Sequence, residues 1–476
     1  MPGLINRANA RRPQSRGWAV GKRLATIGLA ALLCAAGPGF PPLQPKPALA
    51  QSRPLSLIRD AEIEATIRHY ADPLFRAAGL DPNGIRVLLV NDDSINAFVA
   101  GGMRLFINTG LLIQSDSPNQ VKGVIAHETG HIAGAHLSRL QDELKNATIE
   151  QIIGMVLGAG AAVASGNGGA VVAGATLGTE IAKRNLLKYS RTQESAADQA
   201  GMGFLDATHQ SSRGMLEFFQ KLEGQEFLLG QNQDPYLLTH PLTTDRIDSV
   251  QQHVDNSPYS DAKDPHEDMA MQERMVAKLK GYIWPLTRVE QTYPASDKSV
   301  GARYARAIAY YRVSRAPEAL QLMDSLLAEA PDDPFFLEQK AQILFENGKL
   351  AEALPLYTAA YNQRPNEPLL GLELAQAEIE LEQPELTKLA IKHLEGVTTI
   401  EPRNARAWYF LSVAYGRDGN LPMSALAQAE QAMAQGNSQE AWAQAKRALE
   451  GMPAGSPGWL KANDIITEAQ QIKENN

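Results

Sequence analysis

Residues 127–131 read His-Glu-Thr-Gly-His, so two histidines stand four positions apart with a glutamate directly after the first. On a helix, residues four apart lie on one face, and the imidazoles of His127 and His131 can then reach a single metal ion. Glu128 lies beside them and can act on a water molecule without binding the metal. The pattern predicts a catalytic site that holds one Zn²⁺ per chain, with Glu128 as the base.

A zinc site of this kind needs a third protein ligand, for which the sequence offers two candidates. His136 comes one residue too early for the pattern H-E-x-x-H-x-x-G-x-x-H. Glu194 lies four residues before Asp198, and a helix would put both carboxylates on one face. We favour Glu194 because the spacing of His136 does not fit. Asp198 would then accept a hydrogen bond from a ligand histidine and fix its tautomer.

The motif needs a helix beneath it, and the residues before it contain a helix start. Ser117 is a typical N-cap, Pro118 suits the first helical position, and Gln120 stands where a capping side chain can reach back. We therefore expect a helix that runs from Ser117 through the motif.

Two segments before that helix have the pattern of strands. Residues 86–90 are largely apolar, which is typical of a buried strand, and residues 103–107 alternate. We interpret 103–107 as an edge strand along which an extended substrate lies, so that Met103, Leu105 and Ile107 contact it.

Two residues far beyond the motif are further candidates. His240 is predicted to be catalytic: it can stabilise the oxyanion of the reaction, or occupy the open metal position and hold the enzyme idle. A capping histidine at the surface is the alternative. Arg246 can bind the substrate backbone or a structural carboxylate, and both roles stay open.

The C-terminal part repeats with a period of 34 residues, which is the period of the tetratricopeptide repeat (TPR), a helix–turn–helix unit. Pro331 and Pro365 are one period apart, whereas Pro402 follows after 37 residues, so the third unit carries a small insertion or a shifted turn. Small residues fall where paired helices must approach closely, at Ala307, Ala319, Ala341, Gly348, Ala353 and Ala360. Such units stack into an all-α superhelix whose groove suits peptides and protein surfaces.

The first fifty residues differ from the rest of the chain in charge. They hold seven of the 45 bases and no acid, which leaves 38 bases against 53 acids, a net charge of −15, after residue 50. Lys22-Arg23 precede a short apolar run, and Ala48-Leu49-Ala50 offers a cleavage site, so we predict a signal peptide and export; a short membrane anchor is the alternative. The acidic remainder makes nucleic acid an improbable partner. Cys34, the one cysteine, lies in this segment, so disulfide, iron–sulfur and cysteine-protease chemistry are excluded for the rest.

Residues 151–179 carry no charged residue and are rich in glycine. They are too weakly apolar to span a bilayer. A hairpin of small-residue helices, a flap over the zinc site, a packed core pair and a membrane contact are the interpretations that stay open.

The predicted organisation follows from these segments. The fold class is an α+β zincin metalloprotease domain, mostly helical with a small sheet, followed by the all-α TPR superhelix. We place a signal peptide at 1–50, the metalloprotease domain at 52–255, a linker and connecting helix at 256–300, and the TPR domain at 301–470.

The motif His127-Glu128-Thr129-Gly130-His131, followed some sixty residues later by Glu194 and Asp198, resembles the HtpX/CAAX-prenyl-protease family of gluzincins. Asn96-Ala97-Phe98, Ile107–Leu112 and Thr239-His240-Pro241 with Arg246 add to the resemblance, and the signal peptide and TPRs are similar to its periplasmic branch. The resemblance implies zinc bound by His127, His131 and Glu194, Glu128 as catalytic acid–base, and Asp198 behind the ligands. It also implies unfolded or misassembled outer-membrane β-barrel proteins as clients, and the β-barrel assembly complex of a Gram-negative bacterium as a partner.

Two functions follow as expectations. The first is an exported zinc metalloendopeptidase whose TPRs recruit clients or the assembly machine. The alternative is a TPR-based periplasmic chaperone or adaptor with a largely latent protease site.

Overall fold

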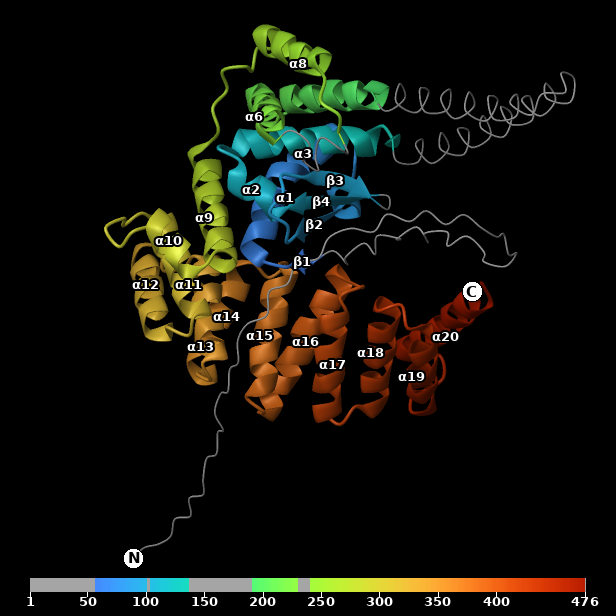
Figure 1. The fold of residues 1–476 in the computed structure, drawn as a ribbon. Helices are drawn as coiled ribbons and strands as arrows, with labels where there is room; N and C mark the ends of the chain where they lie inside the picture. Colours follow the sequence, from blue (N-terminus) through green and yellow to red (C-terminus); the bar gives the residue numbers. More distant parts are fainter. Residues whose placement is uncertain (1–55, 101–102, 137–190, 230–239, 476) are drawn as a thin grey trace, which may run out of the picture. The chain divides into compact units, whose positions relative to one another are not determined.

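The computed structural model describes residues 56–100, 103–136, 191–229 and 240–475 (Figure 1). The segments 1–50 and 151–179, for which a signal peptide and an uncharged hairpin or flap are predicted, lie outside the described residues. No helix within the described ranges combines the length and the apolar character needed to cross a bilayer.

The N-terminal part is built on a four-stranded sheet with the strand order β1-β2-β4-β3. Its strands are β1 (Leu57–Ile58), β2 (Arg86–Val90), β3 (Ala97–Ala100) and β4 (Arg104–Asn108). β4 pairs with β2 in parallel and with β3 antiparallel. Phe98 and Phe106 face each other across the β3–β4 pair with their rings stacked 4.9 Å apart, which helps to fix the register.

This order corrects the substrate-binding strand expected at 103–107. β4 has a neighbour on each side, so its backbone has no open edge for an extended peptide. Leu105 and Ile107 are 0% and 1% exposed in the core, and Met103 precedes the strand. The prediction was wrong because residues 97–100 were not identified as a strand, although they lie just before β4 and pair antiparallel with it.

Helices surround this sheet and supply the rest of the core. Figure 1 shows α3 running along the sheet, with α6 and α8 stacked beyond it. The helices are α1 (Ala61–Ala77), the 3₁₀ turn η1 (Pro82–Gly84), α2 (Thr109–Gln114), α3 (Pro118–Ala133), a helix over 191–207, α6 (Arg213–Leu229) and α8 (Thr244–Asn256). One apolar cluster joins them, because Phe75 of α1, Leu89 of β2, Val124 of α3 and Phe219 of α6 all belong to it.

The region predicted as a linker with a connecting helix contains two helices, α9 (His266–Ile283) and α10 (Leu286–Thr292). Met275 and Leu279 of α9 are buried in the core of the N-terminal part. Ala277 of the same helix is buried against Ala305 and Ala309 of α11 (Val300–Arg312). α9 is therefore a structural member of both parts, and the longest stretch without regular structure in this region is the polar segment 257–265.

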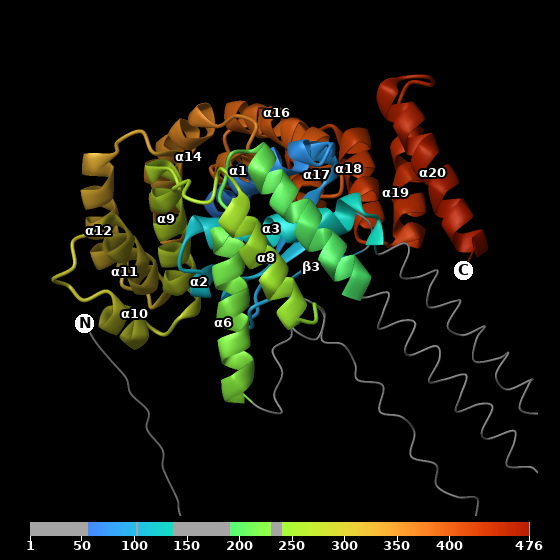
Figure 2. The ribbon, with the colours of Figure 1, turned by 90° about the horizontal axis from the view of Figure 1, so that it is seen from above.

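The C-terminal part is an all-α array of helices that pack in antiparallel pairs and form a curved row (Figure 2). They are α11 (Val300–Arg312), α12 (Ala316–Glu329), α13 (Pro334–Glu346), α14 (Leu350–Gln363), α15 (Pro368–Glu380), α16 (Pro384–Ile400), α17 (Ala405–Arg417), α18 (Leu421–Ala434), α19 (Ser438–Glu450) and α20 (Pro457–Asn475). The small residues of the repeat lie where the pairs touch: Ala341, Ala353 and Ala360 are fully buried. The α+β domain followed by a TPR array is the predicted fold.

A buried ionic cluster connects α1 and α9 with the first TPR helices. Lys278 of α9 lies 2.8 Å from Asp60, the N-cap of α1, and 3.5 Å from Glu338 of α13. Glu62 accepts a hydrogen bond from Tyr304 of α11 at 2.7 Å and one from Arg274 at 2.7 Å. Charged groups on α1, α9 and α13, together with the hydroxyl of Tyr304 on α11, thus hold one another in an interior that excludes water.

Candidate metal centre

Helix α3 presents the motif from within the core. Ser117 caps the helix by accepting the backbone N–H of Gln120, and Pro118 takes the first turn, so the predicted helix start is confirmed. Gln120 completes the cap, since its side-chain oxygen accepts the N–H of Asp116 at 3.0 Å. The helix is buried from Val121 to Gly130, which fixes the orientation of the motif.

A second helix, residues 191–207, brings Glu194 and Asp198 against α3. The crossing is tight at two glycines. A methyl group on Gly130 would lie 2.6 Å from the carbonyl oxygen of Ala197, and one on Gly201 would lie 3.0 Å from the backbone of Ala126 and His127. The absence of side chains at these two positions lets the backbones approach closely enough for the ligand candidates to meet.

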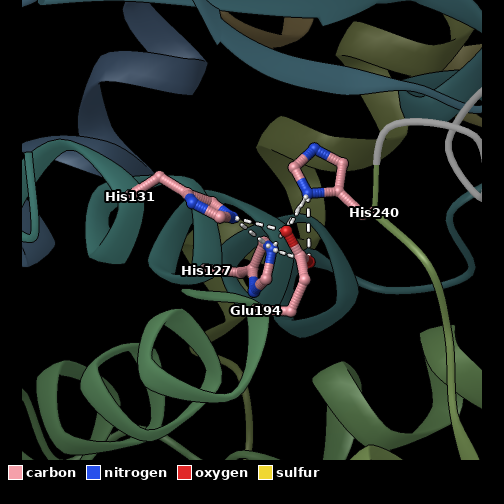
Figure 3. Close-up of side chains that lie close together, drawn as sticks. All are labelled: His127, His131, Glu194 and His240. Atoms are coloured by element: carbon pink, nitrogen blue, oxygen red, sulfur yellow. Dashed lines mark hydrogen bonds and ion pairs between the residues drawn. The ribbon is translucent and has the colours of Figure 1, made fainter. Parts of the chain in front are cut away.

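Four side chains converge at this crossing, as Figure 3 shows. The Nε2 atoms of His127 and His131 lie 3.1 Å apart, and each is 3.4 Å from an oxygen of Glu194. His240 Nδ1 is 3.2 Å from Glu194 Oε2 and 3.4 Å from His127 Nε2. One ligand atom from each of the four residues can be chosen so that all lie within 4.8 Å of one another.

Behind the ligand candidates, Asp198 and Arg246 form a second layer. His127 donates from Nδ1 to Asp198 Oδ1 at 2.8 Å, which leaves its Nε2 to face the cluster. Arg246 donates to both oxygens of Asp198, lies 3.0 Å from Glu194 Oε2 and donates to the carbonyl oxygen of Pro241. Two roles were considered for Arg246: contact with the substrate backbone and contact with a structural carboxylate. The guanidinium is buried among these partners, so Arg246 binds structural carboxylates and the predicted contact with substrate is corrected.

Electrostatics make this pocket favourable for a cation. Burial lowers the pKa of His127, but hydrogen bonds to Asp198 and Glu194 outweigh it and raise that pKa to about 10. Burial also opposes ionisation of Glu194 and Asp198, yet their hydrogen bonds to His127, His240 and Arg246 hold both pKa values below the ordinary range. The pKa of His131 falls to about 2 through burial and the neighbouring His127, so this imidazole is neutral.

The donor set fits a zinc ion. When His127 carries one proton, on Nδ1, its Nε2 and that of His131 lie 3.1 Å apart, each 3.4 Å from an oxygen of Glu194, an arrangement that a shared cation stabilises. Glu128, fully buried, has no hydrogen-bond partner for either carboxylate oxygen among the described residues, and Oε1 lies 3.4 Å from His240 Nε2. Burial raises the pKa of Glu128, so its basicity is increased.

The second candidate for the third ligand takes a different place. His136 follows the end of α3 and contacts the other ring nitrogen of His131, Nδ1 to Nδ1 at 2.9 Å. It is not one of the four converging residues. Sequence reasoning considered His136 only as a ligand; the helix-ending Gly134 is the signal that the chain turns there.

The chain is similar to a known peptidase family and to several known proteins. The model of Peptidase family M48 matches residues 58–254. The β-barrel assembly-enhancing protease of Yersinia pestis is 27% identical over 354 residues, which are 72% of this chain and 70% of that protein. The putative β-barrel assembly-enhancing protease of Vibrio cholerae is 27% identical over 425 residues, 86% of this chain and 81% of that protein. Among solved structures, the TPR protein YrrB covers 38% of this chain and 94% of its own, at 17% identity and a TM-score of 0.30.

Proposed function

We propose, from the premise that residues 58–254 are a domain of Peptidase family M48, a metallopeptidase family, that the chain is a zinc metalloendopeptidase. His127, His131 and Glu194 would hold the ion. Zinc bound there supplies the positive charge that acidifies a water molecule and polarises a peptide carbonyl.

The observation that carries this proposal is the burial of the Glu128 carboxylate next to a ligand candidate. A fully buried carboxylate that accepts no hydrogen bond from the described residues costs folding free energy, which a chemical task for Glu128 would explain. Beside a metal ligand, that task is to accept the proton of the attacking water and to pass it to the leaving amine. Asp198 keeps His127 in the tautomer that offers Nε2, and Arg246 keeps Asp198 in place.

His240 would act as a fourth ligand in the state described here. Its position within 3.4 Å of both His127 and Glu194 supports this role over a surface cap. A chain in this state is latent, because a histidine stands where a water or substrate must enter. Displacement of His240 would free the position, after which the imidazole could stabilise the oxyanion.

For the substrate, we propose misfolded or stalled outer-membrane β-barrel proteins in the periplasm. Relatives named β-barrel assembly-enhancing protease span most of the chain and support this class of client. The TPR array would recruit the client or the assembly complex. With β4 internal, β3 is the strand on that side of the described sheet that can accept an extended peptide.

The decisive experiment compares the purified chain with Glu128→Gln. Metal analysis is expected to find one zinc in both proteins, and digestion of an unfolded β-barrel protein is expected only with the wild type. Equal digestion by both would reject Glu128 as the base, and the absence of bound zinc from the wild type would reject the metal site.

The second candidate function is a TPR chaperone or adaptor with a latent protease site. The position of His240 among the ligand candidates favours this second function, because a histidine there closes the metal site to water and substrate. Prevention of barrel-protein aggregation by Glu128→Gln, at the level of the wild type, would support this function.

A further inference from the structure

His136 occupies a built position at the end of the motif helix. α3 ends at Ala133 with Gly134 as its C-cap, and Ala135 adopts φ = 50°, a left-handed conformation that a non-glycine residue adopts at a cost. This turn brings the His136 ring back to the last helical turn, where it is 7% exposed. A methyl group on Gly134 would lie 2.3 Å from His136 Nε2, so the ring fits only because residue 134 lacks a side chain.

The contact between His131 and His136 joins one particular nitrogen of each ring. His131 Nε2 faces Glu194 and His127, while its Nδ1 lies 2.9 Å from His136 Nδ1 with the two rings at 80°. An imidazole that offers Nε2 to a metal carries its proton on Nδ1. That N–H must then be donated, and the nitrogen that accepts it is His136 Nδ1.

We propose that His136 is a positioning residue for the metal site: its Nδ1 accepts the Nδ1–H of His131 and so fixes the tautomer and ring orientation of that ligand. The inference rests on the proposed function, because it assumes that His131 binds the ion through Nε2. His136 does for His131 what Asp198 does for His127, with a neutral acceptor in place of a carboxylate.

A second contact joins His136 to the helix that carries the third ligand. Gln193, the residue before Glu194, donates from its side-chain amide to the carbonyl oxygen of His136 at 3.0 Å. His136 thus fixes the His131 ring with its side chain and the 191–207 helix with its backbone. Substitution of the side chain tests the first role alone, because the backbone contact stays.

The test uses the full chain and three variants, with His131→Ala as the reference for the loss of a ligand. His136→Phe keeps a ring but removes the acceptor, whereas His136→Asn restores an acceptor near the Nδ1 position. His393→Phe is the control. This substitution on α16 also removes a histidine hydrogen bond, the one between His393 and Glu378, but at a position far along the chain from the metal site. Zinc affinity is measured by chelator competition, and the ligand field by the absorption spectrum of the Co²⁺-loaded protein.

We expect His136→Phe to bind zinc about 10- to 100-fold more weakly than the wild type. His136→Asn and His393→Phe are expected to stay close to wild type in affinity and in the Co²⁺ spectrum. Wild-type affinity in His136→Phe would overturn the inference, as would a loss of binding as complete as in His131→Ala, which would make His136 a ligand. If the wild type itself bound no zinc, the proposed function would fail instead.

Discussion

Arg246 donates to both carboxylate oxygens of Asp198, from Nε to Oδ2 at 2.6 Å and from Nη2 to Oδ1 at 2.8 Å. All of these atoms are buried, and the same carboxylate accepts the His127 proton. α8, which starts four residues after His240, therefore holds in place the group that orients a metal ligand on α3. The ligand helices and the His240 segment are connected through one guanidinium.

Removal of this guanidinium should destabilise the fold. Arg246→Ala leaves Asp198 as a buried charge without its main partner, and we expect a loss of about 3–5 kcal/mol in the free energy of unfolding. Urea titration measures it. Arg213→Ala, which breaks the exposed pair with Asp261, is the matched control and should cost little because both side chains face water. Equal losses in both variants would contradict the structural role of Arg246.

Substitution of His240 distinguishes its two proposed roles. If the imidazole occupies the fourth metal position, His240→Ala should digest an unfolded β-barrel protein faster than the wild type and bind zinc more weakly. Initial rates from gel densitometry report the first effect. A slower digestion at full zinc occupancy would instead make His240 a transition-state residue, and Glu128→Gln in the same background should abolish the activity in either case.

The crossing of the two ligand helices depends on the absence of a side chain at Gly130. Gly130→Ala places a methyl group 2.6 Å from the backbone oxygen of Ala197, so we expect a loss of about 1–3 kcal/mol and weaker zinc binding. Gly203 lies on the same 191–207 helix with nothing within 4 Å of its Cβ position. Gly203→Ala should therefore stabilise the protein by about 0.5–1 kcal/mol. Thermal unfolding of both variants checks the contrast.

The buried ionic cluster predicts a dependence of stability on pH. Burial, only partly offset by Lys278, raises the pKa of Glu338 from 4.5 to about 7. Between these values the folded state binds more protons than the unfolded state, so this group makes the protein less stable as pH rises from about 4.5 to 7. Glu338→Gln should flatten that part of the curve of unfolding free energy against pH. An unchanged slope would show that other groups carry it.

In the repeat region, the period of the sequence corresponds to the lengths of the helices. The three extra residues between Pro365 and Pro402 appear as a longer second helix: α16 has 17 residues, whereas α12 and α14 have 14 each. Because each repeat contacts mainly its neighbours, local spacing determines the structure there. The start of α3 was predictable for the same reason, since Ser117, Pro118 and Gln120 act within one turn.

The parts that sequence reasoning missed depend on long-range contacts. The edge position of β3 follows from strand order, and the carboxylate partners of Arg246 lie 48 and 52 residues earlier in the chain. Alternation in residues 103–107 indicates a strand but not its neighbours. His136 was considered as a ligand because of its spacing. Gly134 indicates that α3 ends there, but nothing in the sequence indicates that Ala135 adopts a left-handed conformation and directs the His136 ring to His131.

The position of α9 bears on how the protein unfolds and on where it can be cut. One face of this helix completes the N-terminal core through Met275 and Leu279, and Ala277 completes the first layer of the repeats. The boundary between the two parts thus runs along a helix, so a truncation at residue 256 exposes apolar surface in both fragments. We therefore expect the two parts to melt in one cooperative transition, which would make the repeats a source of thermal stability for the peptidase.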